Sequence, residues 1–547
     1  MNDEPSRGTP GAVPDTEGQL VTLQAAGGTA LRQPPTGPET RGRSLRAASR
    51  GADLLAAARH RVPWPLAVVL AVQAALSLRL IWSNTAFEDE ALYLWVGHME
   101  WAHWLHGAPV QPFQTRFSGA PELYPPLAAV ADSIGGLTAA RLLSLVFMTG
   151  VTCFLWATAR SLVGGRAALV AAAAFATLAG TAFLGAFATY DALALLLLSC
   201  ATWVAVRASR RPVRAARYGM PRLAGTCLLA GVLLGVACAV KYASALFVPS
   251  VLIVAVLAAW REAGRQRAAA ALAGTAAGVA MTLAAGLAAG GHGYLEGVLV
   301  TTLNRPAATA SPFTILKLSY LWTGFILVTA VLAVIASRGE RAVDRWLLAV
   351  LAMTAFLVPA EQIHVATTVS LHKHVVFGAW FASMAAGYPF ARLSRIDTTK
   401  GWAAVAAIPI VACTLLDSIP QAGALFADWV NTSPITAILP PLIARYPGRY
   451  LTSTDLYQVL GYYEQGRTGW TQWQSDLYFS LPGSAAGPAS DLVAIRAHYF
   501  SLIIIATQRT SVTSTDESVL ADMRKLGGYR IVADARGFEA WTPAEES

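Results

Sequence analysis

The chain has 547 residues, of which 55% are hydrophobic and only 13% are charged, and its mean hydropathy is +0.48. Soluble domains carry roughly 25% charged residues, so this composition excludes an ordinary soluble enzyme. Lysine and arginine (41) outnumber aspartate and glutamate (32), for a net charge of +9. The basic excess lies in a few connections between apolar segments, so it indicates membrane orientation and not a nucleic-acid partner.

Residues 1–62 precede the first apolar run, which begins at Trp64. Most of this segment is rich in glycine, proline, threonine, serine and arginine and has no hydrophobic periodicity. Such a composition buries too little apolar surface to offset the entropy of ordering. We predict a disordered cytoplasmic tail, and no cleavable signal peptide is evident.

The next part of the chain, residues 63–419, contains about eleven apolar segments near the length that crosses a bilayer. They are residues 64–83, 137–159, 167–188, 191–206, 223–240, 242–260, 268–289, 320–337, 346–360, 374–391 and 401–419. The sequence therefore predicts a mainly α, polytopic membrane domain with about eleven transmembrane helices.

Arginine and lysine concentrate in alternate connections of this domain, within residues 160–166, 207–222, 261–267, 338–345 and 392–400. The connections between them are nearly free of base. Because short cytoplasmic loops carry the basic excess, we predict a multi-pass protein of the cell membrane with a cytoplasmic N-terminus and an extracytoplasmic C-terminal domain. The scarcity of lysine beside arginine hints at a bacterial source.

The first predicted external loop, residues 84–136, contains an amphipathic pattern. Leu92, Trp95, Val96 and Met99 follow i, i+3, i+4 and i+7 spacing. This spacing predicts a helix with one apolar face, lying at the membrane interface.

The last segment, residues 420–547, has a different pattern. Residues 501–507 and 529–533 indicate strands, and residues 516–526 indicate a helix closed by two glycines. We predict a small extracytoplasmic α/β domain. It contains no glycine-rich nucleotide-binding pattern.

Few ionisable residues interrupt the apolar segments, and those that do fall on the predicted outer side. Glu88-Asp89-Glu90 follow the first span, Asp191 lies in a hairpin turn, and Lys241 lies in the next such turn. Arg141 and the run His372-Lys373-His374 add base on the same side. Ionisable residues at membrane depth are costly and indicate functional sites. The implied ligand is an anionic group held beside a carboxylate.

Each of these residues also has a structural interpretation. Acids in the first turn of a helix stabilise it by about 0.3–1 kcal/mol, which applies to Glu88-Asp89-Glu90. Asp191 is a suitable turn residue, and Lys241 can extend its ammonium to the interface. Arg141 and the His372-Lys373-His374 run can contact lipid headgroups.

Several short motifs occur in a characteristic order. They are Phe87-Glu88-Asp89-Glu90-Ala91-Leu92-Tyr93, Tyr124-Pro125-Pro126-Leu127, Ala140-Arg141, Tyr190-Asp191-Ala192 and Lys241-Tyr242. In this order and topology, over about residues 64–419, the chain resembles family 39-like glycosyltransferases of the GT-C class. That group includes protein O-mannosyltransferases and the aminoarabinose transferase of lipid A. The chain departs from the group after His372-Lys373-His374, where tyrosine and proline often follow.

The resemblance implies transfer of a sugar from a polyprenyl-phosphate donor to a hydroxyl of a glycan, lipid or protein at the outer face. It implies a catalytic acidic pair at Asp89 and Glu90, with Asp89 as the base, and donor-phosphate contacts at Lys241 and Lys373. Arg141 and His372 are further candidates for phosphate binding. Asp191 is a third catalytic candidate, either positioning the acceptor or sharing a divalent cation with Asp89.

The same chemistry follows from general principles. A polyprenyl phosphate is a good leaving group, so one carboxylate base and cations near the phosphate suffice. A single in-line displacement inverts the anomeric carbon. The sequence has no metal-ligand motif, so the cofactor stays open. A polytopic transporter or lipid-carrier flippase is the alternative, although no internal repeat of the kind common in transporters is evident. A third hypothesis is a non-catalytic assembly protein whose external domain binds a partner.

Overall fold

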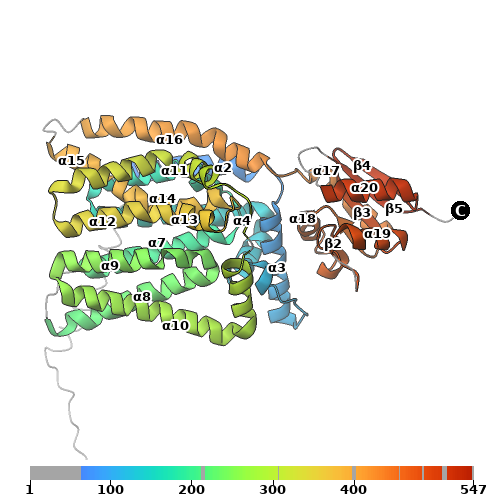
Figure 1. The fold of residues 1–547 in the computed structure, drawn as a ribbon, viewed down its shortest axis with the longest axis horizontal. Coiled ribbons are helices and arrows are strands. Elements are labelled where there is room, and N and C mark those ends of the chain that lie inside the picture. Colours follow the sequence, from blue (N-terminus) through green and yellow to red (C-terminus); the bar gives the residue numbers. More distant parts are fainter. Residues whose placement is uncertain are drawn as a thin grey trace, which may run out of the picture. The chain divides into compact units, whose positions relative to one another are not determined.

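The computed structural model describes residues 63–210, 216–305, 307–396, 402–454, 456–482, 486–507 and 514–544. The tail predicted to be disordered, residues 1–62, lies outside this part of the chain. The described residues form a helical bundle, a helix that crosses the ends of the bundle, and a smaller domain with a five-stranded sheet (Figure 1).

The bundle is built from helices of very different lengths. They are α2 (Trp64–Ile81), α4 (Tyr124–Leu162), α5 (Gly165–Ala176), α6 (Ala179–Leu184), α7 (Tyr190–Arg210), α8 (Ala216–Val240), α9 (Val248–Ala263), α10 (Arg265–Val298), α11 (Pro312–Ala336), α12 (Ala342–Met353), α13 (Leu357–His364), α14 (Leu371–Ala386), α15 (Tyr388–Ile396) and α16 (Trp402–Ala427). Each of the eleven predicted spans falls on one or more of these helices, which confirms the predicted fold class.

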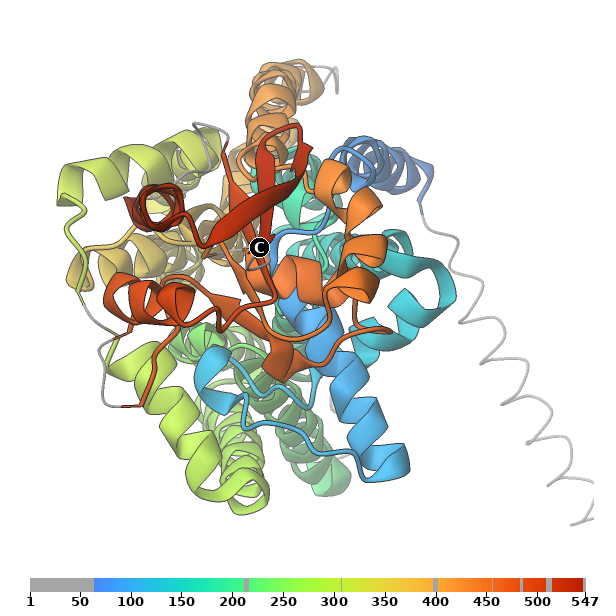
Figure 2. The same cartoon turned by 90° about the vertical axis from the view of Figure 1, so that its right-hand side faces the viewer.

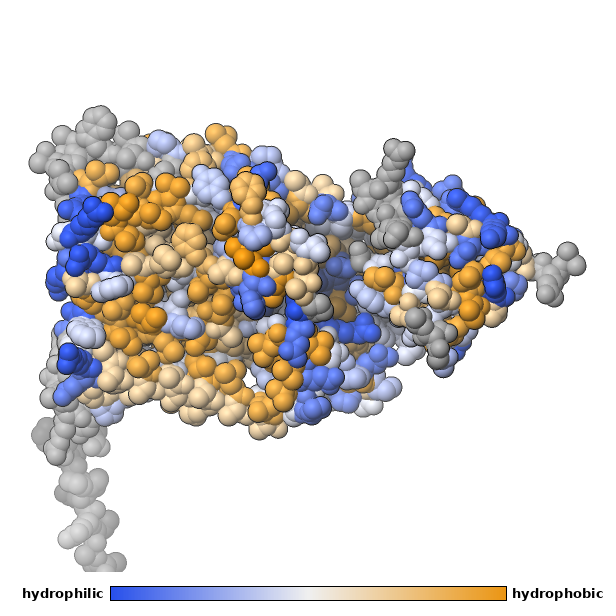
Figure 3. All heavy atoms as spheres, viewed as in Figure 1, coloured by the Kyte–Doolittle hydropathy of each residue, from blue (hydrophilic) through white to orange (hydrophobic). Residues whose placement is uncertain are grey.

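Nine helical segments of the described chain are long and apolar enough to cross a membrane. The two remaining predicted spans, 167–188 and 374–391, are broken: α5 and α6 share the first, and α14 and α15 share the second. A hydropathy pattern averages over such breaks, so it did not reveal them. Large apolar side chains such as Phe313, Leu321 and Val328 are exposed along α11. Hydrophobic residues cover much of the bundle surface in Figure 3, as expected for a multi-pass membrane protein.

Helix α4 contains the turn from the external loop into the second predicted span. Gly135 and Gly136 interrupt its helical backbone, and Gly136 has a φ of 62° that favours glycine. The second half of α4 therefore begins where the sequence predicted a span, at residue 137.

The helix predicted in the first external loop is α3 (Glu88–His106), which runs across the ends of the bundle helices (Figures 1 and 2). Its backbone approaches α4 closely: a Cβ on Gly97 would lie 2.0 Å from the Pro125 carbonyl oxygen. The apolar side chains predicted to face a membrane interface are covered by protein instead. Trp95 is buried, and its ring lies 4.7 Å from the ring of Trp470 in the C-terminal domain.

The C-terminal domain has a sheet with strand order β2-β1-β3-β5-β4. The strands are β1 (Tyr450–Thr452), β2 (Trp473–Ser475), β3 (Leu502–Ala506), β4 (Tyr529–Ala535) and β5 (Phe538–Pro543). Strands β1, β2 and β3 are parallel, and β5 pairs antiparallel with both β3 and β4. Its helices are α17 (Ser433–Arg445), α18 (Leu456–Tyr463), α19 (Pro488–Arg496) and α20 (Ser514–Leu526).

The predicted strands correspond to β3 and β4, and the predicted helix corresponds to α20. All five residues of β3 are buried, as a continuous apolar run requires. The sequence did not predict β1, β2 or β5. Strands β1 and β2 have three residues each, too few to show an alternating pattern. Helix α16 continues to Ala427, beyond the predicted domain boundary at residue 420.

A buried carboxyl group in this domain gives a pH-dependent prediction. Burial, with a smaller contribution from the neighbouring Asp476, raises the pKa of Asp491 from 3.8 to about 8. The folded domain then keeps a proton that the unfolded chain releases, so rising pH favours unfolding by up to about 1.4 kcal/mol per pH unit within this interval. We expect Asp491→Asn to match the native chain near pH 4 and to exceed its stability near pH 8. Thermal unfolding of the purified chain across this range tests it.

The exposed Asp534 provides a matched control. Asp534→Asn should leave the pH profile of the melting temperature unchanged. A constant difference between Asp491→Asn and the native chain at every pH would contradict the assignment.

Candidate active site

An ion pair joins the first turn of α3 to the first turn of α14. The Lys373 ammonium donates to Asp89 Oδ2 at 2.8 Å. The side chain of Asp89 keeps 28% of its exposure, whereas that of Lys373 keeps 7%. An ammonium has three donors, so Lys373 retains donors for a second anionic group. Asp89 therefore offers an accessible carboxylate beside a cation.

A second ion pair lies deeper, between the first turn of α7 and the break that follows α8. Lys241 Nζ lies 2.5 Å from Asp191 Oδ1, and both side chains are buried. The Thr189 hydroxyl donates to the other Asp191 oxygen at 3.0 Å. The Lys241 ammonium also lies 4.7 Å from the centre of the Tyr190 ring, a cation–π distance.

Aromatic rings connect the two ion pairs. The rings of Tyr93 and Tyr190 lie 4.7 Å apart, and the Lys373 ammonium lies 5.4 Å from the Phe187 ring. Electrostatic interactions of Asp191 extend to Lys373 as well as Lys241. The structure thus brings Asp89, Asp191 and both lysines into one cluster, although Asp89 and Lys373 are 284 residues apart.

Sequence reasoning gave Tyr93 and Tyr190 no role of their own. Both belong to motifs that indicated the site, and Tyr93 follows Asp89 by one helical turn, which places the two on one face of α3. That spacing is the signal that could have identified Tyr93.

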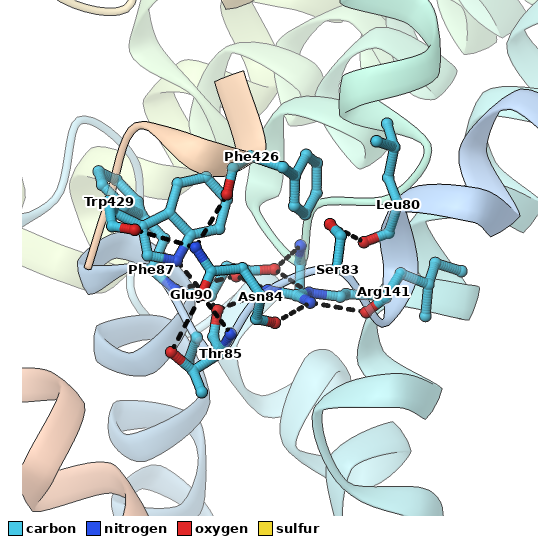
Figure 4. A network of polar contacts seen from close by, with 12 residues as sticks. Leu80, Ser83, Asn84, Thr85, Phe87, Glu90, Arg141, Phe426 and Trp429 are labelled. Atoms are coloured by element: carbon cyan, nitrogen blue, oxygen red, sulfur yellow. Dashed lines mark hydrogen bonds and ion pairs between the residues drawn. The ribbon is translucent and has the colours of Figure 1, made fainter. Parts of the chain in front are cut away.

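Glu90 and Arg141 form a separate and saturated network (Figure 4). Arg141 Nε and Nη2 donate to the two Glu90 oxygens at 2.8 and 2.6 Å. The other Arg141 donors reach the carbonyl oxygens of Ile81, Asn84 and Thr85 at 2.7–3.0 Å. A guanidinium has five N–H donors, and all five have acceptors here.

The Glu90 carboxylate is saturated in the same way. Besides the two bonds from Arg141, it accepts the backbone N–H groups of Phe87 at 3.0 Å and Ala188 at 2.8 Å. A carboxylate has about four acceptor sites, so Glu90 has none left for a substrate proton. This geometry favours a positioning role for Glu90 and Arg141. The catalytic role of Glu90 and the phosphate-binding role of Arg141 stay predictions.

His372 packs against aromatic rings next to the one that lies beside Lys373, since the Phe183 and Phe187 rings are 4.6 Å apart. Its ring packs edge-on against Phe183 at 5.1 Å and lies 6.0 Å from Trp322. The roles predicted for His372 and Lys241 in phosphate binding stay predictions. Among the residues that the structure describes, no group of three or more histidine, cysteine, aspartate or glutamate side chains is arranged to hold a metal ion.

The C-terminal domain docks onto the external loop through polar contacts that the sequence did not reveal. Asp132 on α4 accepts the Tyr462 hydroxyl at 2.6 Å and contacts His98 Nε2 at 2.7 Å. The Tyr463 hydroxyl accepts the backbone N–H of Ala86 at 3.0 Å. These contacts hold the chain just before Asp89 against α18.

Comparisons with known proteins place this arrangement in a class. Residues 127–285, which include Arg141, Asp191 and Lys241, match the model of the dolichyl-phosphate-mannose-protein mannosyltransferase family. No curated protein sequence matches the chain.

The fold is similar to that of ArnT from Cupriavidus metallidurans, solved bound to undecaprenyl phosphate. The match has a TM-score of 0.60 and 13% identity and covers 88% of this chain and 98% of ArnT. The oligosaccharyltransferase AglB from Archaeoglobus fulgidus, solved with an inhibitory peptide and a dolichol-phosphate, matches with a TM-score of 0.53 and 11% identity over 88% of this chain and 74% of AglB.

The chain therefore has the fold of the GT-C class of membrane glycosyltransferases. The resemblance predicted from its motifs, to relatives of the protein mannosyltransferase and ArnT type, is confirmed.

The saturated network gives a prediction about stability. Removing one partner of a buried ion pair leaves the other charge uncompensated and typically costs about 3–5 kcal/mol. We expect Arg141→Gln to lose about this much stability in detergent without any substrate, and Glu90→Gln to behave similarly. The double variant should be less destabilised than the sum of the two, because each single change breaks the same contact. Unchanged melting of substrate-free Arg141→Gln would refute the positioning role.

Proposed function

We propose that the chain is a glycosyltransferase that moves a sugar from a polyprenyl-phosphate donor to an acceptor hydroxyl at the outer face of the membrane. The observation that carries this proposal is the Asp89–Lys373 pair, which combines an accessible carboxylate with a buried cation. ArnT and AglB were both solved with polyprenyl phosphates, which supports a lipid-linked donor.

In this reaction the acceptor oxygen attacks the anomeric carbon while the bond from that carbon to the phosphate oxygen breaks. The acceptor proton passes to Asp89, and the polyprenyl phosphate leaves as an anion. One displacement by one attacking oxygen inverts the anomeric centre. Asp89 is better placed to act as the general base because it is the partly exposed acid of the cluster. Asp191 is enclosed and paired with Lys241.

Lys373 has two roles in this reaction. Before the donor binds, it neutralises Asp89; once a phosphate arrives, its remaining donors stabilise the charge that develops on the leaving group. The negative phosphate draws the ammonium away from Asp89 and makes that carboxylate a freer acceptor for the proton. Lys241 pairs with Asp191, and its ammonium lies over the Tyr190 ring, so it holds the enclosed acid of the same cluster in place.

The test is transfer of labelled sugar from a panel of polyprenyl-phosphate sugars by membranes that contain matched amounts of each variant. We expect Asp89→Asn to reduce transfer by about 100- to 10,000-fold, the usual contribution of a general base. Glu88→Gln is the control, because it removes one negative charge from the same turn of α3 without touching Asp89.

Near-normal transfer by Asp89→Asn would overturn the role of Asp89. Movement of the lipid-linked sugar across sealed vesicles that contain no acceptor, without any transfer, would favour the flippase alternative. The panel also identifies the sugar, since only the matching donor gives a labelled product.

A further inference from the structure

A cavity lies at the end of the bundle opposite the carboxylate–lysine cluster, where α7 ends. Asp191 opens α7 and Arg210 closes it, so the cavity is a helix length away from the carboxylate–lysine cluster. The cavity has a volume of about 250 Å³, well above the roughly 10–15 Å³ that admits one water. Its walls come from the ends of α4, α7 and α9 and from the starts of α12 and α15.

Basic residues from three helices line this cavity: Arg160, Arg210 and Arg261. Two acids, Glu340 and Asp344, also line it, but both already have partners in the protein. The Tyr388 hydroxyl donates to Glu340 at 2.7 Å. Asp344 contacts Arg261 Nε at 3.0 Å and accepts from an arginine outside the cavity at 2.9 Å.

Two of the arginines are less fully paired within the protein than the acids are. Arg160 stacks over the Trp156 ring at 5.1 Å, and no ion pair to it occurs within the described ranges. Arg210 lies 3.3 Å from Glu262, but both side chains are about one-third exposed, and such surface pairs contribute little. Arg261 is already engaged, since it pairs with Asp344 and donates to the Leu162 carbonyl oxygen at 2.8 Å. The positive charge that a ligand could use therefore comes from Arg160 and the weakly paired Arg210.

The residue that precedes helix α5 belongs to the same wall. Gly164 lines the cavity and precedes α5 with a φ of 103°, and no side chain caps the helix. The first N–H groups of a helix have no intrahelical acceptor and attract anions, most of all phosphate groups. Leu162, Val163, Leu347 and Leu348 form an apolar wall beside these polar groups.

We propose that this cavity binds the phosphodiester headgroup of an anionic phospholipid from the membrane leaflet at the arginine-rich end of the bundle. Arg160 and the weakly paired Arg210 match the phosphate, and the apolar wall matches the start of the acyl chains. Three of the basic connections between predicted spans contribute an arginine to this cavity, and basic pockets between helices at a membrane surface suit anionic headgroups. The proposal does not depend on the sugar-transfer reaction.

The first measurement is the melting temperature of the full chain in nanodiscs of phosphatidylglycerol or of phosphatidylcholine. The second is the amount of phosphatidylglycerol that stays bound after exchange into detergent. We expect phosphatidylglycerol to raise the melting temperature of the native chain and to be retained. Arg160→Gln and Arg210→Gln should bind it about tenfold or more weakly, as loss of a charge-assisted hydrogen bond implies.

Arg345→Gln is the matched control. Arg345 is an exposed arginine at the same end of the bundle that does not line the cavity, so this variant should retain the lipid as the native chain does. If Arg345→Gln and Arg160→Gln lost equal amounts of bound phosphatidylglycerol, binding would depend on overall charge, and the proposed site would be overturned. Inorganic phosphate that reproduces the whole effect in phosphatidylcholine nanodiscs would assign the cavity to a soluble anion instead. An unchanged melting temperature with no retained lipid would also overturn the proposal.

Discussion

The buried pair of Glu90 and Arg141 is the contact on which the rest of the outer end depends. It joins α3 to α4, fixes the backbone between Ile81 and Thr85, and reaches the turn before α7 through the N–H of Ala188. Taking two charges out of water is costly, and the cost is offset only when every donor and acceptor is satisfied. That condition is met here, so the pair holds the start of α3, and with it Asp89, in one position relative to α7.

In the carboxylate–lysine cluster, by contrast, not every donor and acceptor is satisfied. Asp89 is only partly enclosed, and its partner Lys373 has donors to spare, so the ion pair can open when an anion arrives. Asp191 and Lys241 are enclosed and hold each other. One end of the bundle thus contains three ion pairs. Glu90–Arg141 has all its hydrogen bonds made, Asp191–Lys241 is enclosed, and Asp89–Lys373 is accessible. The accessible pair is therefore the candidate for chemistry, and the fully bonded pair is the candidate for positioning.

Much of this arrangement could be predicted from the sequence. The lengths of the apolar segments predicted the helical bundle. Single charges such as Asp191 and Lys241 were recognisable because uncharged residues surround them in the sequence. The saturation of Glu90 and Arg141 could not be predicted, because it depends on carbonyl groups that carry no sequence signal. The covering of Trp95 by Trp470 was missed for a related reason: an apolar helix face looks the same in sequence whether lipid or protein covers it.

The segment that precedes α3 is held by residues near the end of the bundle. The Thr85 carbonyl oxygen accepts from Trp429 Nε1, and the Thr85 hydroxyl accepts from the backbone N–H of Thr432. During synthesis, therefore, the first external loop has no complete set of partners until more than three hundred further residues have been made and the last helix has been inserted. A chain interrupted before α16 could still form the Glu90–Arg141 network, but the segment that leads into α3 would lack its contacts with Trp429 and Thr432. Full support of Asp89 is consequently a late event in assembly.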